Sequence, residues 1–537
     1  MDFFLALANI VRGGKIRNLI RSSFETYRYG IQAVYFLNLF SKEEQIRERG
    51  FYFTQKMKGQ KVLLAELKNE ALLVADVDKK LLEVEKRIQN SIINSDTWLH
   101  SLKQKDQLSN IESQSIEIEQ GQLFEAQFEL QKLQREIDLQ HPEFLEKRLE
   151  TSFETYRSVQ QLLEDDEILI EYVLTCCEFF VLAITKDQPI QIIEAPAKGS
   201  TTYNILHIKK LLETSTLSRP SSRKKFISMS HELYEQFITP IEELIADKKR
   251  LIIIPDQFAH YVPFEMLLKS NEVKPHHKLN YLIKDFEISY HYSSTLLARA
   301  RKKSIQGDGS VYAFAPIYND ANDNINIASL NPSIDNLTLR AIDNNGFFAP
   351  LPYSEKEVNS IFKLFNKKNK KANNILATRS NAKEQDLKNN LVKPYQFIHI
   401  AAHSFANLLN PNFSGIACYQ KDEWIDGILF SNEISGLKTQ ADLITLSSCE
   451  SGGGQVDETE GILGLNRAFI LSGTPNVVFS LWKVYDKVNA KLMVDFYKNI
   501  ISGNDYSESL RKAKLKLLKK ESTASPHFWA PYLLIGR

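Results

Sequence analysis

Apolar residues recur every three or four positions over residues 1–150, a spacing typical of amphipathic helices. Residues 24–40 form one apolar, aromatic stripe, and Ser41 followed by Glu44 predicts a capping box at the start of the next helix. Two longer segments, 78–105 and 112–140, predict an antiparallel helical hairpin that ends at His141 and Pro142. We therefore predict a helical, repeat-like arm over residues 1–150.

The pattern changes after about residue 160. Continuous apolar runs at 168–173, 179–185 and 250–254 predict buried strands, and they alternate with helical stretches at 203–214 and 228–247. The alternation continues with strands at 396–402, 442–447 and 476–480 and with a helix predicted over 461–472. Such alternation predicts an α/β region with a mostly parallel sheet between helices. Residues 317–350, rich in Asn and Asp, are predicted to form a long surface loop.

Composition narrows the class of protein. Lys and Arg number 67 against 66 Asp and Glu, so bulk charge does not imply nucleic-acid binding, although a local patch is not excluded. No apolar run is long enough to span a membrane, and the N-terminal charges have the wrong polarity for a secretory signal. Four cysteines without a CxxC pair favour a reducing, cytoplasmic compartment and no zinc site. We expect no metal, no cofactor and no membrane contact.

Two apolar strands end in reactive side chains. The run 397–402 leads to His403, and the run 443–448 leads to Cys449, 46 residues later; caspases separate their His and Cys by about 50 residues. If the strands are neighbours, both side chains lie at the carboxyl edge of the sheet, where α/β proteins bind ligands. A thiol needs a neighbouring imidazole to take its proton and return it to the leaving amine. The N–H groups of Ser404 and Cys449 are candidate donors to an oxyanion.

Other interpretations of these residues remain open. Cysteine is often buried, so Cys449 could be a thiol of the core. His399, inside its strand, fits a packed core histidine, and Cys176, Cys177 and Cys418 fit structural positions. No phosphate-binding glycine loop and no zinc-protease motif is present, which disfavours nucleotide and metalloprotease chemistry.

The sequence resembles the CHAT domain family, caspase-like (clan CD) cysteine peptidases usually found behind tetratricopeptide repeats. The resemblance covers most of the chain and rests on segments in this order: 160–163, 169–172, 252–256, 262–265, 398–403, 446–452, 461–469, 480–484 and 528–532. It implies a helical arm over 1–150, an inactive caspase-like half over 151–303 and an active half over 304–537. His260 is expected to be structural. The helical region is short for the family, which leaves an extension before Met1 open.

The resemblance implies a catalytic dyad of His403 and Cys449. The residue after the histidine is often Gly in the clan and is Ser404 here, which retains the backbone N–H. Candidates for the substrate pocket are the residue two before the nucleophile, the loop after the next strand and an acidic segment, namely Ser447, Trp482, Lys483, Asp457, Glu458 and Glu460. The acidic segment could equally be a solvated loop.

These observations lead to one functional hypothesis with an alternative. We expect a cysteine endopeptidase that cleaves a partner protein and stays latent until a regulatory protein engages the helical arm, in bacterial defence or regulated proteolysis. The alternative is a catalytically silent CHAT-fold scaffold that acts by interaction alone.

Overall fold

The computed structural model describes most of the chain. The described residues are 15–41, 43–74, parts of 80–99, 110–142, 153–175, 178–196, 199–214, 216–302, 307–316, 351–407, 411–419, 427–447, 455–457, 461–483 and 485–537. The predicted loop at 317–350 lies outside them.

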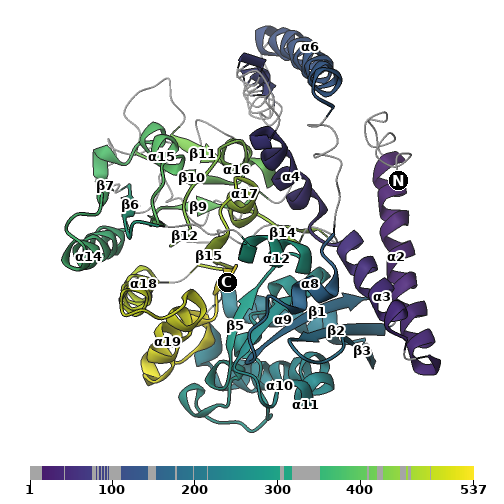
Figure 1. The fold of residues 1–537 in the computed structure, drawn as a ribbon. Helices are drawn as coiled ribbons and strands as arrows, with labels where there is room; N and C mark the ends of the chain where they lie inside the picture. Colours follow the sequence, from purple (N-terminus) through teal and green to yellow (C-terminus); the bar gives the residue numbers. More distant parts are fainter. Residues whose placement is uncertain are drawn as a thin grey trace.

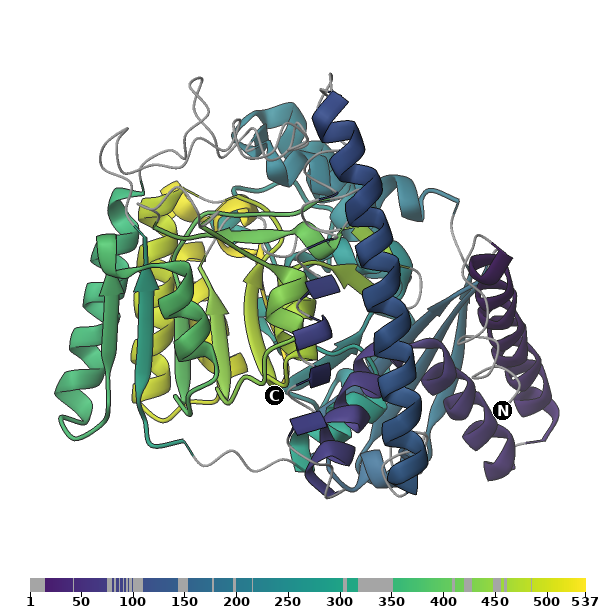
Figure 2. The ribbon, with the colours of Figure 1, turned by 90° about the horizontal axis from the view of Figure 1, so that it is seen from above.

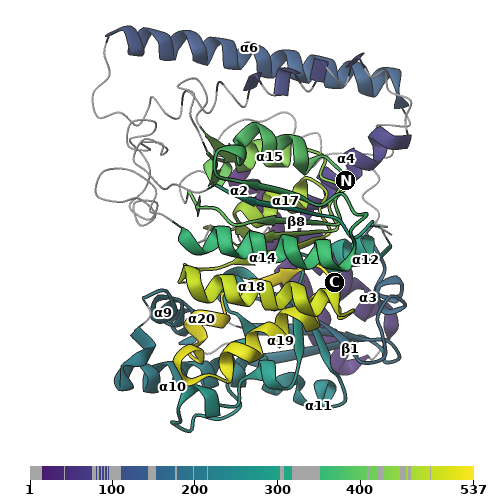
Figure 3. The same ribbon diagram turned by 90° about the vertical axis from the view of Figure 1, so that its left-hand side faces the viewer.

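The N-terminal region is helical, as predicted. Its long helices are α2 (Lys15–Phe40), α3 (Glu44–Met57), α4 (Gln60–Val74) and α6 (Asn110–Gln140). Figure 3 shows α6 apart from the rest of the fold. Gln134 on α6 donates to Glu85 at 3.0 Å, so the described helical residues of the first hairpin arm lie beside the second.

The predicted capping box is wrong. The residue that precedes α3 is Glu43, and its side chain makes no capping bond. The Ser41 hydroxyl instead donates to the Glu43 carboxylate at 2.9 Å. The helix therefore begins three residues after the predicted cap, and Ser41 binds the side chain before the helix instead of a backbone N–H within it.

One sheet of eleven strands runs through the remainder of the fold, in the order β3-β2-β1-β4-β5-β16-β15-β12-β8-β6-β7. The strands are β1 (Glu167–Leu174), β2 (Glu178–Thr185), β3 (Gln191–Pro196), β4 (Arg250–Ile254), β5 (Glu287–Tyr290), β6 (Val311–Ala315), β7 (Ile375–Thr378), β8 (Phe397–Ile400), β12 (Leu443–Leu446), β15 (Asn476–Ser480) and β16 (Tyr532–Ile535). In Figure 2 the green and yellow strands and the blue strands form two neighbouring groups, with the purple N-terminal helices beside the blue group.

The sheet contains two sets of parallel strands that meet at β15 and β16. β1, β4, β5 and β16 are mutually parallel, and β15, β12, β8, β6 and β7 form the second parallel set. β15 and β16 pair antiparallel at the boundary. β16, the last strand in sequence, shares a single parallel pair with β5 and so joins the two sets. The segments that follow β4 and β12 lie together, because the His260 ring lies against Gly461.

Helices cover both faces of the sheet. They are α8 (Tyr156–Gln160), α9 (Thr201–Glu213), α10 (Pro220–Phe237), α11 (Glu242–Ile245), α12 (Ser294–Lys302), α14 (Pro352–Lys368), α15 (Glu384–Leu391), α16 (Ser431–Ser435), α17 (Leu465–Leu471), α18 (Asp486–Ile501), α19 (Tyr506–Leu518) and α20 (Pro526–Trp529). α14, α18 and α19 lie side by side (Figures 1 and 3). α2, α3, α8 and α12 pack on one face of β1 and β4, and α9 and α10 belong to the core on the other face.

The predicted fold class is confirmed: a mostly parallel sheet lies between helices and follows a helical region. The helix predicted over 461–472 is only partly present. Residues 461–463 form strand β14 (Gly461–Leu463) of a hairpin with β13 (Gln455–Asp457), and the helix begins at Leu465. None of the helices in the described ranges has the length and apolar character needed to cross a bilayer. The domain boundaries at 150 and 303 stay a prediction.

Candidate active site

The strands that carry the predicted dyad are neighbours in the sheet. β8 and β12 pair in parallel, with Phe397 opposite Leu443 and Ile400 opposite Leu446. The N–H of Ser447 continues this ladder by donating to Ile400 O at 2.8 Å. His403 follows the end of β8 by three residues, and Cys449 follows the end of β12 by the same number. Cys449 itself lies outside the described residues.

His403 lies in a buried position beyond β8. It is 1% exposed, and its carbonyl oxygen accepts from the N–H of Ala417 at 2.9 Å. The next residue, Ser404, begins strand β9 (Ser404–Phe405), which pairs antiparallel with β10 (Gly415–Ala417). Backbone groups alternate in direction along such a ladder, so the Ser404 N–H is directed away from β10. That direction suits a donor to a ligand beside His403.

The end of β12 is held by polar side chains that the sequence did not suggest. Ser447 is buried, and its hydroxyl accepts from the amide of Asn489 on α18 at 2.9 Å. The Tyr532 hydroxyl of β16 donates in turn to the Asn489 carbonyl oxygen. Two residues before Ser447 on this strand, Thr445 accepts from the Tyr497 hydroxyl at 2.9 Å. Tyr532 lies in a motif that the sequence singles out, whereas Asn489 has no signal beyond its helical position.

Two pocket candidates follow β15 and differ in exposure. Trp482 is 1% exposed and packs in the main core, and its indole N–H donates to His527 O at 3.0 Å. Lys483, the next residue, is exposed. The backbone at Leu481 is fixed by a 3.0 Å bond from its N–H to Pro531 O. In this conformation Lys483 is therefore the one of these two side chains that solvent reaches.

The acidic candidates follow the predicted nucleophile. Asp457 is half-buried at the end of β13, opposite Gly461, while Glu458 and Glu460 lie outside the described residues. Gly461 has φ +73° and faces the His260 ring, and a Cβ there would come within 2.8 Å of the ring. Desolvation lowers the pKa of His260 to about 3; Lys58 acts in the same direction and Asp457 opposes it. The β13–β14 hairpin thus packs on the turn after β4.

The carboxyl ends of β1 and β4 are closed by side chains from the N-terminal helices. Arg28 on α2 forms a buried ion pair with Asp256 at 3.2 Å. Lys58, which follows α3, lies 3.7 Å from the Glu171 carboxylate and donates to Pro255 O at 3.2 Å. Burial lowers the pKa of Lys58, and the Glu171 charge acts against that shift.

Gln55 completes this arrangement: it donates to Glu171 at 3.1 Å and accepts from the Thr295 N–H at 2.9 Å. We refer to Arg28, Gln55, Lys58, Glu171 and Asp256 as the arm anchor. The sequence offered one signal for it, because Glu171 interrupts an otherwise apolar strand and a buried charge requires a partner. Its partners come from segments more than a hundred residues away, so pattern alone could not identify them.

His399 is confirmed as a core histidine. It is fully buried, and its Nε2 lies 2.7 Å from the Glu357 carboxylate on α14. Cys418 is a buried free thiol, whereas Cys176 and Cys177 lie outside the described residues. Within the ranges that the structure describes, no three His, Cys, Asp or Glu side chains are grouped to hold a metal ion.

Comparisons with known proteins agree with the fold. The family model described as CHAT domain matches residues 228–537. Tetratricopeptide repeat protein 28 of Mus musculus is 28% identical over 109 residues, and its Homo sapiens counterpart is 27% identical over the same length. These matches cover 20% of this chain, and the chain spans about 4% of the length of those curated relatives.

The comparison with solved structures matches two proteins at low similarity. The separase–securin complex of Saccharomyces cerevisiae matches with a TM-score of 0.41 and 11% identity, over 74% of this chain and 31% of that one. The Arg-specific cysteine proteinase gingipain R matches with a TM-score of 0.36 and 10% identity, over 63% of this chain and 75% of that one.

Proposed function

This chain belongs to the CHAT domain family, and from that premise we propose that it is a cysteine endopeptidase (a caspase-like hydrolase) that cleaves a partner protein with His403 and Cys449. One observation carries the proposal. β8 and β12 are adjacent, parallel and in register, so His403 and Cys449 follow matched positions at one edge of the sheet. Reactive groups at the carboxyl ends of neighbouring parallel strands are typical of α/β enzyme sites.

The proposed reaction follows the chemistry of these two side chains. The Cys449 thiolate attacks the scissile carbonyl carbon, and the peptide C–N bond breaks as the leaving nitrogen takes a proton from His403. Water, deprotonated by the same imidazole, then hydrolyses the thioester and releases the thiol. The N–H groups of Ser404 and Cys449 stabilise the oxyanion of each tetrahedral intermediate. A partner protein supplies the cleaved peptide bond.

The substrate pocket is proposed to lie between the segment after β12 and the loop after β15. Lys483 is the exposed member of the second segment, and Asp457, Glu458 and Glu460 form the acidic stretch of the first. Ser447 and Trp482 belong to these two segments and are buried. A pocket of mixed charge does not by itself define the residue before the cleaved bond.

We propose that the enzyme is latent until a regulatory protein engages the helical arm. The arm anchor supports this proposal, because the charges of Lys58 and Asp457 act on the pKa of His260 in opposite directions. Movement of α3 would alter the charge beside this ring and so the packing of the β13–β14 hairpin that follows Cys449. Regulated proteolysis in the bacterial cytoplasm, including defence, is the setting that this family membership suggests.

The test compares wild type with Cys449→Ala in a lysate of the cells that make the protein, where the arm's partner is present. New protein N-termini are identified by mass spectrometry. Cys418→Ala is the matched control, because that thiol is buried on β10's edge of the fold and lies outside the proposed dyad. New N-termini with wild type and Cys418→Ala, and none with Cys449→Ala, support the peptidase. Identical N-termini in all three samples would favour the silent scaffold.

A further inference from the structure

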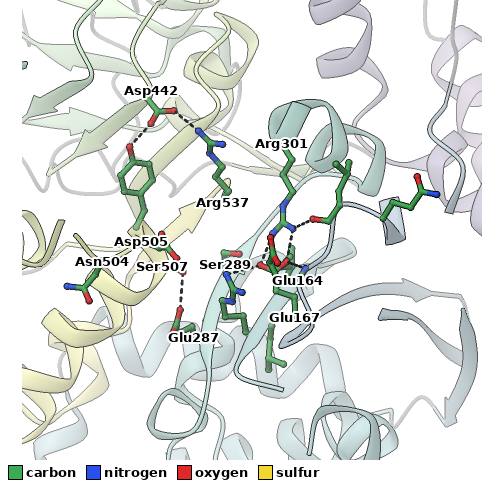
Figure 4. A pocket seen from close by; sticks show the side chains of 16 residues that line it. Glu164, Glu167, Glu287, Ser289, Arg301, Asp442, Asn504, Asp505, Ser507 and Arg537 are labelled. Carbon is green, nitrogen blue, oxygen red and sulfur yellow. Dashed lines mark hydrogen bonds and ion pairs between the residues drawn. The ribbon is translucent and has the colours of Figure 1, made fainter. Parts of the chain in front are cut away.

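A cleft of about 680 Å³ lies at the boundary between the two strand sets, away from His403. Residues of β4, β5 and α12 form one side, and the start of α19 with the C-terminal segment after β16 forms the other (Figure 4). Arg250 and Glu287 are opposite one another on β4 and β5, as are Ile252 and Ser289 two residues later. Alternation along the strands therefore turns all four side chains toward the same face.

The cationic side chains of the cleft are already neutralised. Arg301 makes two bonds to the Glu167 carboxylate, at 2.6 and 2.8 Å. Arg250 donates to Asp166 at 3.1 Å, and Arg537 lies 3.7 Å from Asp442. An anionic ligand would have to compete with these carboxylates, which disfavours phosphate or carboxylate binding here.

The Glu287 carboxylate, by contrast, is not neutralised by such an ion pair. Glu287 forms no ion pair with any Lys or Arg of the described residues, and its carboxylate accepts a 3.3 Å bond from the Ser507 hydroxyl. Burial and then the nearby Glu508 raise the pKa of Glu287, whereas the charges of Arg511 and Arg250 act against that shift. Asp505, exposed at the start of α19, lines the same cleft.

A second observation points to a ligand. Ser289 lines the cleft and is 6% exposed, yet its hydroxyl makes no hydrogen bond with any residue in the described ranges. The hydroxyl oxygen is open to the cleft, so it is available to bond an external partner there. Leu162 and Ile252 supply an apolar wall beside it.

We propose that this cleft binds a primary ammonium group carried on an aliphatic chain. Glu287 receives the ammonium, Ser289 accepts one of its hydrogens, and Leu162 and Ile252 contact the methylene groups. Asp505 supplies further negative charge at the mouth. A free polyamine and a lysine side chain of a partner protein share this chemistry.

The test is calorimetric titration of the full chain with spermidine and, separately, with Nα-acetyl-lysine methylamide. Loss of a charge-assisted contact in Glu287→Gln is expected to weaken binding about tenfold or more. Asp505→Asn, at an exposed position that folding tolerates, is expected to weaken binding about threefold. Glu272→Gln, whose partner is Lys274 outside the cleft, is the matched control and leaves the affinity unchanged.

The two ligands distinguish the sources. Binding of spermidine alone identifies a free polyamine, and binding of the lysine analogue identifies a lysine side chain. The proposal is overturned if neither ligand binds saturably up to about 10 mM, if Glu287→Gln and Glu272→Gln bind equally, or if inorganic phosphate binds more tightly than either amine. The measured binding affinity does not depend on peptidase activity, so this proposal can fail while the proposed function holds, and the reverse.

Discussion

The two carboxyl-terminal edges of the strand sets are built in opposite ways. At the ends of β1 and β4, the arm anchor fills the edge with buried ion pairs, including Arg28 with Asp256 at 3.2 Å. At the ends of β8 and β12, the sequence continues to His403 and to Cys449. The same architecture therefore provides one edge sealed by its own helices and one edge supplied with reactive groups.

The difference separates charged residues that stabilise the fold from residues that we propose take part in the reaction. A buried charge is costly unless a partner compensates it, and each anchor charge has such a partner. A catalytic edge needs a group that can change its protonation state during the reaction. Each prediction below alters one edge and asks whether the other responds.

The largest effect is expected at the catalytic edge. His403→Ala removes the proposed general base and acid and should lower kcat about a thousandfold. Because His403 is buried, its truncation also leaves a cavity, so the urea midpoint should fall as well and kcat is measured under conditions in which the variant is folded. Peptide cleavage is measured on a substrate identified from the new N-termini. His207→Gln, a histidine on α9, is the matched control, and equal loss in both variants would contradict the role of His403.

The next effect concerns the sealed edge. Lys58→Met leaves the Glu171 carboxylate buried opposite an apolar side chain and should lower the free energy of unfolding by about 3–5 kcal/mol. The double variant Lys58→Met/Glu171→Leu removes both charges and should recover most of that loss. Chemical denaturation measures both. A single variant as stable as wild type would show that the anchor does not hold the arm.

The pH dependence of stability provides a third test. His291, directly after β5, is 5% exposed, and burial lowers its pKa to about 3. The unfolded chain binds a proton below about pH 6.5 that the folded chain excludes, so stability falls as the pH decreases. Between pH 6.5 and 5 this one group costs about 2 kcal/mol. His291→Phe should reduce the slope by the share of this one group, while His260 keeps its own share, as followed by urea unfolding across this range; an unchanged slope would refute it.

A smaller effect is expected from the support beneath the nucleophile strand. Tyr532→Phe removes the donor to Asn489, which holds Ser447, and should lower kcat severalfold at unchanged KM while costing about 1 kcal/mol of stability. Tyr497→Phe is the matched control, because its hydroxyl bonds Thr445, two residues before Ser447 on the same strand. We expect it to lose similar stability and keep kcat. Equal kcat losses would assign both tyrosines to general stability.

The smallest effect sharpens the contrast with the buried anchor. Arg157 and Glu44 form an ion pair between α8 and α3 whose side chains are 62% and 45% exposed. Exposed pairs of this kind contribute little to stability, because solvent screens their charges. Arg157→Ala should therefore shift the urea midpoint only slightly. A loss of stability as large as that of Lys58→Met would contradict the claim that burial makes the anchor pair important.

Much of the candidate site at the ends of β8 and β12 could be predicted from the sequence, because it depends on local pattern. Apolar runs gave β8 and β12, and a histidine and a cysteine at their ends gave the candidate dyad before the pairing was known. The hairpin at 461–463 was missed because a short apolar run fits a strand or a helix equally well. The expected cap at Ser41 failed because the spacing of side chains does not determine which backbone N–H they reach.

The sealed edge could not be derived in the same way. Glu171 stood out within its strand, but its partners Lys58 and Gln55 come from a helix that precedes it by more than a hundred residues. Long-range polar pairs depend on how helices dock on the sheet, and single-sequence patterns do not encode docking. Ser447 shows the same limit, since its position beneath the edge depends on Asn489 of α18.

The most direct test of the central claim measures the thiol of Cys449. Its rate of alkylation by iodoacetamide is followed against pH, by peptide mass, in wild type and in His403→Ala, with buried Cys418 as the internal reference. A paired imidazole should give wild-type Cys449 a pKa below about 7, and the variant should return toward about 8.5. The same pH profile in both proteins would contradict a His403–Cys449 dyad at this edge.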